Sequence, residues 1–180
     1  GLQKMAANAS NVATRHILRS SLYLTLRACE NISLRVADML EFSLTNNALN
    51  PSIGKFNTNK VVLAAEDSGV AREILKKFFE KANLKYEILK EGQSLMNRIE
   101  ELGASKIAMV ITDIEMPEAD GYQVANFIKG NNAYKDIPVI VNSSMTTEAV
   151  QHKMREIGVD GFVGKTDIDS LYKVTKSLIA

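Results

Sequence analysis

The sequence predicts an α/β fold, with a doubly wound five-stranded parallel sheet that is preceded by an α-helical segment. After Lys60, short apolar runs alternate with amphipathic stretches in the order βαβαβαβαβα, and two of the runs are apolar nearly throughout, as buried parallel strands are. Between Gly1 and Pro51 there is no glycine and no proline, the residues that most reliably interrupt helices. We therefore expect a helical segment, a linker and an α/β domain at residues 1–50, 51–59 and 60–180.

The expected strands are the short apolar runs Val61–Ala65, Tyr86–Leu89, Ile107–Thr112, Val139–Asn142 and Gly161–Gly164. The expected helices are the amphipathic stretches 69–82, 92–102, 121–130, 146–157 and 168–179. Asp67 or Ser68 is the expected N-cap of the first helix. A sheet of this kind binds its ligands at the carboxyl ends of the strands, so the residues that follow each strand are candidates for a functional site.

Three carboxylates are expected at this edge. Glu66 and Asp67 directly follow the first strand, and Asp113 directly follows the third. Carboxylates that lie close together repel one another unless a cation neutralises them, and a small ion with oxygen ligands describes Mg²⁺. The ordinary interpretation of an acidic pair after a strand is a helix N-cap.

A hydroxyl and an ammonium group are expected at the same edge, because Ser143 follows the fourth strand and Lys165 follows the fifth. With a metal ion they could hold a phosphoryl group while Asp113 attacks it in line. Singly, a lysine at a strand end is usually solvated, and a serine in such a place usually belongs to a turn. The prediction of a site therefore depends on all of them converging at one edge of the sheet.

Four segments, LAAEDSGVAR, VITDIEMPEADGYQ, IPVIVNSS and GVDGFVGK, resemble the response-regulator receiver family, whose fold is flavodoxin-like. The D-x-x-M-P-x-x-D-G run is the most specific of the shared motifs: Asp113, Met116, Pro117, Asp120 and Gly121. The resemblance implies these roles: phosphoacceptor Asp113, acidic pair Glu66 and Asp67, metal ligand Glu115 through its backbone carbonyl, switch residues Ser143 and Phe162, and family lysine Lys165. It implies Mg²⁺ as cofactor, a histidine kinase as phosphodonor, and a phosphorylated signalling protein rather than an enzyme.

Within the family, Gly164, Lys165 and Thr166, together with VNSSMT, are most similar to the receivers of CheV-type chemotaxis coupling proteins. Such proteins carry a β-rich coupling domain before the receiver, whereas residues 1–60 have a helical pattern. Thr166 stands where most receivers have a proline that supports a cis peptide bond. The sequence leaves open whether the peptide between Lys165 and Thr166 is cis.

Two interpretations of residues 1–50 stay open. Apolar residues at steps of three, four or seven could form one stripe along a long helix or a helical hairpin: Leu22, Leu26, Cys29, Val36 and Leu40. This surface predicts a homodimer and a scaffold for the receiver. Alternatively, the segment that starts at His16 (HILRSSL) resembles the H-E-L-R-T-P-L box of histidine-kinase dimerisation helices, which would make the protein a phosphorelay with His16 as the phosphotransfer residue.

Charge and composition exclude several other classes of protein. Residues 1–60 carry seven Lys and Arg against three Asp and Glu, but no nucleic-acid-binding motif accompanies this charge, so binding of nucleic acid is not expected. Cys29 is the single cysteine, which rules out an internal disulfide, and no apolar run is long enough for a membrane span. We expect a cytoplasmic protein.

Overall fold

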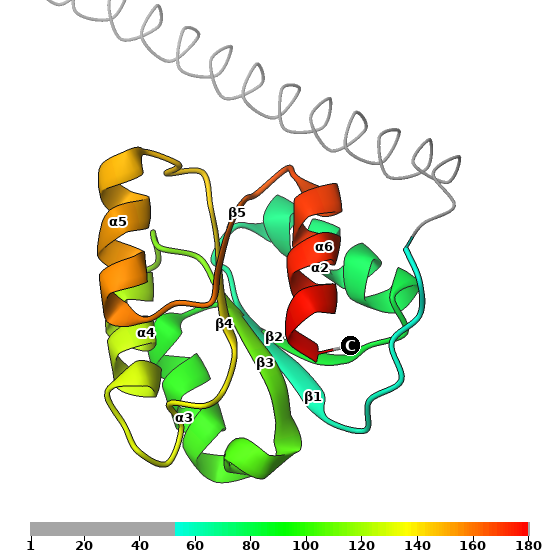
Figure 1. The fold of residues 1–180 in the computed structure, drawn as a ribbon, viewed down its shortest axis with the longest axis horizontal. Coiled ribbons are helices and arrows are strands. Elements are labelled where there is room, and N and C mark those ends of the chain that lie inside the picture. The colour runs from blue at the N-terminus through cyan, green and yellow to red at the C-terminus, as the bar shows by residue number, and fades with distance from the viewer. Residues whose placement is uncertain (1–52, 180) are drawn as a thin grey trace, which may run out of the picture. The chain divides into compact units, whose positions relative to one another are not determined.

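The computed structural model describes residues 53–179, and every structural statement below concerns these residues. Strands alternate with helices along the chain in this order: β1 (Val61–Ala65), α2 (Gly69–Lys81), β2 (Lys85–Leu89), α3 (Gly92–Leu102), the 3₁₀ helix η2 (Ala104–Lys106), β3 (Ile107–Thr112), α4 (Gly121–Lys129), β4 (Val139–Ser143), α5 (Glu148–Ile157), β5 (Gly161–Gly164) and α6 (Ile168–Ile179). Figure 1 shows this alternation as a central sheet between two layers of helices.

The sheet has five parallel strands in the order β2-β1-β3-β4-β5. The chain first moves outward from β1 to β2 and then crosses back over β1 to β3, so the direction of winding reverses between β1 and β3. Open α/β sheets bind ligands at such a reversal, at the carboxyl ends of the strands. The observed topology therefore directs attention to the residues that follow β1 and β3.

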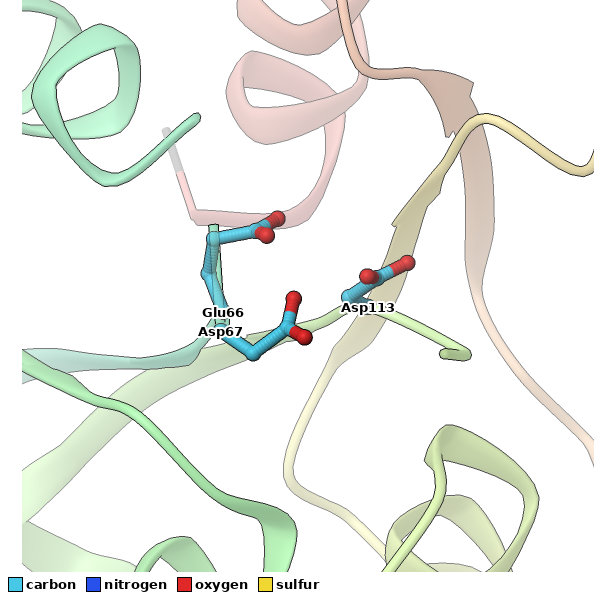
Figure 2. Close-up of side chains that lie close together, drawn as sticks. All are labelled: Glu66, Asp67 and Asp113. Carbon is cyan, nitrogen blue, oxygen red and sulfur yellow. The ribbon is translucent and has the colours of Figure 1, made fainter. Parts of the chain in front are cut away.

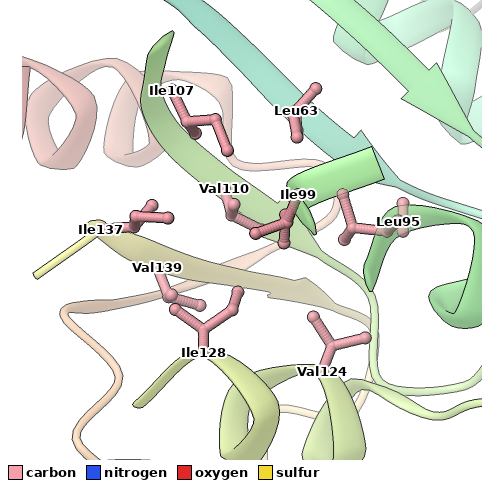
Figure 3. Close-up of a cluster of buried hydrophobic side chains, with 10 residues drawn as sticks. Leu63, Leu95, Ile99, Ile107, Val110, Val124, Ile128, Ile137 and Val139 are labelled. Atoms are coloured by element: carbon pink, nitrogen blue, oxygen red, sulfur yellow. The ribbon is translucent and has the colours of Figure 1, made fainter. Parts of the chain in front are cut away.

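Helices α2 and α6 cover one face of the sheet, and α3, α4 and α5 cover the other (Figure 1). The main core lies under α3 and α4, where buried aliphatic side chains from the helices meet those of β1, β3 and β4 (Figure 3): Leu63, Ala65, Leu95, Ile99, Ile107, Val110, Val124, Ile128, Ile137 and Val139. A fully buried Leu, Ile or Val side chain contributes about 1.5–3 kcal/mol, so this core supplies much of the stability that positions the strand ends.

The predicted fold class is confirmed, and most predicted boundaries lie within one residue of the observed ones. Ser68 is the N-cap of α2, since its side chain accepts a hydrogen bond from the backbone N–H of Ala71. The prediction placed the start of α5 at residue 146, but Thr147 has extended backbone (φ −66°, ψ 150°) and the helix begins at Glu148. The short η2 helix was not predicted.

The predictions on residues 1–50, namely the helical segment, the homodimer and the phosphotransfer role of His16, lie outside the described residues. The expected boundaries of the segment, linker and domain at residues 50 and 60 stay predictions. Within residues 53–179, no helix is both long enough and apolar enough to cross a membrane.

Candidate functional site

Three carboxylates converge at the carboxyl ends of the adjacent strands β1 and β3. Glu66 and Asp67 follow β1 directly, and Asp113 follows β3 directly. Each side chain offers one carboxylate oxygen, and these oxygens lie within 4.8 Å of one another. Figure 2 shows the side chains of Glu66 and Asp67 projecting toward the space beside Asp113. The sheet topology thus brings together the three acidic residues that the sequence singled out.

Lys165 joins the cluster from β5, two strands away from β3. Its Nζ donates hydrogen bonds to Glu66 Oε1 at 2.8 Å and to Asp113 Oδ2 at 2.7 Å. Glu66 and Asp113 are almost completely buried, with exposed fractions of 1% and 2%. One ammonium group therefore faces three carboxylates, which leaves the site with an excess of negative charge.

The hydrogen bonds in this cluster leave room for a cation. Asp113 Oδ1 accepts from the backbone N–H of Ile114 at 2.6 Å, and Glu66 Oε1 accepts from that of Ser68 at 3.0 Å. Glu66 Oε2, in contrast, is buried and makes no hydrogen bond. A buried carboxylate oxygen without a partner is unfavourable by itself, and a hard divalent cation with oxygen ligands is a suitable partner for it.

Burial and pairing shift the ionisation of Glu66 and Lys165. Burial raises the pKa of Glu66 above its ordinary value, and its hydrogen bonds with Lys165 and Ser68 offset this only in part. Burial opposes the charge of Lys165, but its hydrogen bonds to Asp113 and Glu66 outweigh this effect and raise its pKa. The carboxylates thus keep Lys165 protonated, while Glu66 stays ionised less readily than an exposed glutamate.

Arg72, in the first turn of α2, holds the backbone of the acidic pair. Its Nη1 donates to the carbonyl oxygen of Glu66 at 3.0 Å and to that of Asp67 at 2.6 Å. Both bonds are charge-assisted, and such bonds are about twice as strong as neutral ones. Arg72 therefore fixes the direction in which the two carboxylates leave the end of β1.

The loop after β4 adds hydroxyl groups to this edge of the sheet. Ser143 is the last residue of β4, is fully buried, and accepts a hydrogen bond through Oγ from the backbone N–H of Met145 at 3.1 Å. Ser144 Oγ lies 3.5 Å from Glu115 Oε2. Met145 is the exposed large apolar residue of the described part of the chain.

Two further residues of the sequence analysis have a defined place. Phe162, on β5, is half-buried and packs against a small core between α4 and α5 that contains Val141 and Met154. The peptide between Lys165 and Thr166 is trans, as are all others within residues 53–179.

Two glycines set the shape of the loop that carries Asp113. A Cβ atom on Gly121 would lie 2.2 Å from the carbonyl oxygen of Asp113, and one on Gly92 would lie 2.2 Å from that of Ala119. Real Cβ atoms do not approach so closely, and the obstacles are backbone atoms that cannot turn aside. Only glycine fits at these two positions.

With this geometry established, the comparisons with known proteins decide the family. The family model of the response regulator receiver domain matches residues 62–176, which include the whole acidic cluster and Lys165. The chain belongs to this family. Receiver domains accept phosphoryl groups in two-component signalling, and the predicted resemblance is confirmed.

Individual relatives of this receiver domain agree. The chemotaxis proteins CheV2 and CheV1 of Helicobacter pylori are 31% and 29% identical to it over 129 and 130 residues. The matched region covers 71% of this chain in both cases, but 41% of CheV2 and 40% of CheV1, so the chain spans about two fifths of the length of these relatives. The predicted likeness to CheV-type receivers is thereby confirmed.

A solved structure shares the receiver fold. The signal receiver domain of a signal transduction histidine kinase from Syntrophus aciditrophicus aligns with a TM-score of 0.58 and 28% identity. The alignment covers 67% of this chain and 89% of that one.

The role of Arg72 was not predicted from the sequence. The signal available was a basic residue five positions after Asp67 on the first turn of an expected helix, which would place its guanidinium near the preceding loop. Without the loop geometry, that position looks like an ordinary solvated helix residue.

Proposed function

We propose that Asp113 is the phosphoacceptor of this receiver domain and that Glu66, Asp67 and Asp113, with the backbone carbonyl of Glu115, hold a Mg²⁺ ion. The observation that carries the proposal is the excess of carboxylates over cations at the carboxyl ends of β1 and β3, together with the unbonded, buried Glu66 Oε2. Bound Mg²⁺ would neutralise charge on the transferred group and thereby lower the barrier to transfer.

The residues of the chain have separate tasks in this reaction. A carboxylate oxygen of Asp113 forms a bond to phosphorus, while the bond from phosphorus to the donor nitrogen of a histidine kinase or phosphotransfer protein breaks. The electron pair of that bond stays with the donor imidazole, and an acyl phosphate remains on Asp113. Lys165 Nζ, which lies 2.7 Å from Asp113 Oδ2, would neutralise charge on a phosphoryl oxygen.

We propose that Ser143 and Phe162 respond to the phosphoryl group on Asp113. The Ser143 hydroxyl, now bonded to the Met145 N–H, could exchange this bond for one to a phosphoryl oxygen. Phe162 lies two residues before Gly164 on the adjacent strand and is only half-buried, so it has room to change its packing. The protein would then act as a switch that is phosphorylated, rather than as an enzyme with turnover.

The pathway proposed is chemotaxis in the cytoplasm, on the basis of the similarity to CheV2 and CheV1. A homodimer through residues 1–50 and a phosphotransfer role of His16 stay predictions, because they depend on residues outside the described part.

The proposal is tested with beryllofluoride and Mg²⁺, which together mimic an acyl phosphate. We expect them to raise the melting temperature of the wild-type protein, because a ligand that binds only the folded state stabilises it by RT ln(1 + [L]/Kd). Asp113→Asn should abolish this gain. Asp120→Asn is the matched control, because Asp120 caps α4 in the same loop and asparagine caps helices equally well. A wild-type protein without any gain, or an equal gain in Asp113→Asn, would contradict the proposal.

A further inference from the structure

The residues before β1 are docked against the domain, although their sequence suggested a plain linker. Phe56 is 7% exposed, and its backbone N–H donates to the carbonyl oxygen of Ala82 at 2.9 Å, just after α2. Its ring meets that of Tyr172, on α6, edge to face with centroids 5.9 Å apart. We call residues 53–59 the strap. Figure 1 shows it running past α2 and α6 to the start of β1.

The second attachment of the strap is the hydroxyl of Tyr172. It accepts a hydrogen bond from the backbone N–H of Gly54 at 2.9 Å, across 118 positions of sequence. A Cβ atom at position 54 would lie 3.0 Å from this hydroxyl oxygen, closer than nearly all real contacts. A residue larger than glycine at position 54 would therefore crowd this hydroxyl, and a movement of Tyr172 away from the strap would break the bond to Gly54.

Tyr172 is connected to the acidic cluster by the short stretch of chain that starts at Lys165, in which Thr166 and Asp167 are exposed. Lys165 lies two residues before Asp167, whose side chain caps α6 by accepting from the backbone N–H of Ser170 at 2.9 Å. Two buried residues, Ile168 and Leu171, then anchor the helix, and Leu171 directly precedes Tyr172. A helix held in this way moves as a unit, so a displacement at Lys165 would reach Tyr172.

Phosphorylation of Asp113 would displace Lys165. In the present structure Nζ is shared between Glu66 and Asp113. A phosphoryl group on Asp113 adds oxygen atoms that can accept hydrogen bonds from this ammonium group. Lys165 would have to move to form these bonds. The shift would be small, but Tyr172 holds the strap through both the Gly54 hydrogen bond and the Phe56 ring contact, so its movement would act on both.

We propose that the strap is a docking element whose hold on α6 weakens when Asp113 is phosphorylated, so that the state of the site is passed to the residues before position 53. The inference rests on the proposed function, since it needs Asp113 to accept the phosphoryl group. It assigns Tyr172 and Phe56 to signal output, although neither belongs to the acidic site.

The test is hydrogen exchange of the full 180-residue chain, followed in peptides that cover the strap, with Mg²⁺ alone and with Mg²⁺ plus beryllofluoride. We expect the strap to exchange roughly threefold faster or more with beryllofluoride, because the amides of Gly54 and Phe56 lose their acceptors more often. The melting temperature is measured on the same samples.

Two variants each weaken the hydrogen bond between Gly54 and Tyr172, one by changing the tyrosine and the other by changing the strap. Tyr172→Phe keeps the ring but removes the acceptor, and Gly54→Ala crowds the same hydroxyl from the strap. In both, the strap should exchange fast already with Mg²⁺ alone and gain no more with beryllofluoride, while the gain in melting temperature persists. Tyr134→Phe is the matched control, since Tyr134 packs on Phe127 instead and should behave as wild type.

The outcomes separate the two claims. A higher melting temperature with unchanged exchange of the strap would overturn this inference and leave the proposed function in place. No change in either quantity would overturn both. A strap response that persists in Tyr172→Phe and Gly54→Ala, or one that is also lost in Tyr134→Phe, would show that Tyr172 does not carry it.

Discussion

Two half-buried lysines lie near opposite ends of the sheet and differ in the groups that surround them. Lys129 Nζ, near the start of β4, donates to the carbonyl oxygens of Lys135 and Ile137 and to Asp160 Oδ2, at 3.1, 2.9 and 2.7 Å. Its three donors have three acceptors, and its charge is balanced by one carboxylate. Lys165, at the end of β5, has two carboxylate partners and a third carboxylate close by.

The difference separates a structural ion pair from a site that can bind a ligand. The cluster around Lys129 is neutral and saturated, and Asp160 Oδ2 also accepts from the backbone N–H of Val139 at 2.7 Å, so the cluster fastens the loop before β4. The cluster around Lys165 has a negative excess and an unbonded buried oxygen. A buried ion pair alone would therefore be a poor guide to function, whereas an imbalance of charge and of hydrogen bonds is informative.

The largest effect is expected from Lys129→Met. The variant leaves the Asp160 carboxylate without its cation and two carbonyl groups without a donor, so the free energy of unfolding should fall by about 2–3 kcal/mol. This is less than the roughly 3–5 kcal/mol for fully buried pairs, because the Asp160 side chain keeps 34% of its surface exposed. Urea unfolding with and without Mg²⁺ measures it. If Mg²⁺ restored the lost stability, the Lys129 cluster would also bind a cation and would not differ from the acidic site.

Lys165→Met should behave differently. It leaves three carboxylates without a cation, but burial already raises the pKa of Glu66, so this carboxyl can take up a proton and relieve the repulsion. We therefore expect a smaller loss of about 1–2 kcal/mol in the absence of Mg²⁺. Added Mg²⁺ takes the place of the missing charge, so it should stabilise this variant more than it stabilises the wild type. The measurement is the urea midpoint as a function of Mg²⁺ concentration. A smaller Mg²⁺ effect than in the wild type would count against the acidic cluster as a metal site.

Arg72→Met tests whether the hydrogen bonds of Arg72 to the backbone of Glu66 and Asp67 hold the acidic site in shape. Removing a positive charge near the cluster should by itself strengthen Mg²⁺ binding, whereas losing the two bonds to the carbonyl oxygens of Glu66 and Asp67 should weaken it. We expect the second effect to win, with Mg²⁺ affinity about tenfold lower, or about 1.4 kcal/mol. Calorimetric titration measures the affinity. Lys76→Met, which removes a charge from the exposed face of the same helix, serves as control and should not weaken it.

The smallest effect concerns Glu87, whose carboxylate accepts from Arg98 Nε and Nη2 at 2.7 and 2.8 Å on the surface. The hydrogen bond with Arg98 lowers the pKa of Glu87 below its ordinary 4.5. A lowered pKa gives stability that is present above pH 4.5 and is lost as the pH falls through the folded-state pKa. Because about a third of each side chain is exposed (33% for Arg98 and 37% for Glu87), solvent screens the pair and the effect should stay below about 1 kcal/mol.

Glu87→Gln tests this with urea unfolding between roughly pH 3 and pH 7, a range that brackets the ordinary carboxyl pKa. The variant should differ from the wild type above that pKa and approach it at the acid end. An effect as large as that of Lys129→Met would mean that the greater exposure of the Arg98 side chain, 33% against 11% for Lys129, does not weaken its ion pair.

The sequence predicted the sheet and its acidic edge well because both depend on local patterns. Short apolar runs specify buried strands, and in a parallel sheet the residue after each strand must lie at one edge, which is how Glu66, Asp113 and Lys165 were identified. The D-x-x-M-P-x-x-D-G run indicated the receiver family. These inferences need only the order of the residues along the chain.

The parts that were not predicted depend on contacts between distant segments. Phe56 lies in an asparagine-rich stretch that was interpreted as linker, and its burial depends on Ala82 and Tyr172, which the pattern around position 56 does not reveal. The bonds from Arg72 to the carbonyl oxygens likewise depend on how the loop turns after β1. No periodicity reports such backbone contacts.

The close approach of Gly92 and Gly121 to backbone carbonyls has a consequence for how the domain unfolds. The loop of residues 113–121 is wedged between the first turn of α3 and the end of β3, and the N–H of Gly121 bonds to the carbonyl oxygen of Ile114 at 3.0 Å. Residues at both ends of the loop, Ile114 and Ala119, are also buried. The ends of the loop cannot open while the core stays intact, because β3 and α3 would have to move apart, whereas Glu115, Pro117 and Glu118 in its middle are exposed. The backbone at Asp113 would therefore open only together with the core, so the acidic site and the hydrophobic core would form and disappear in one cooperative transition.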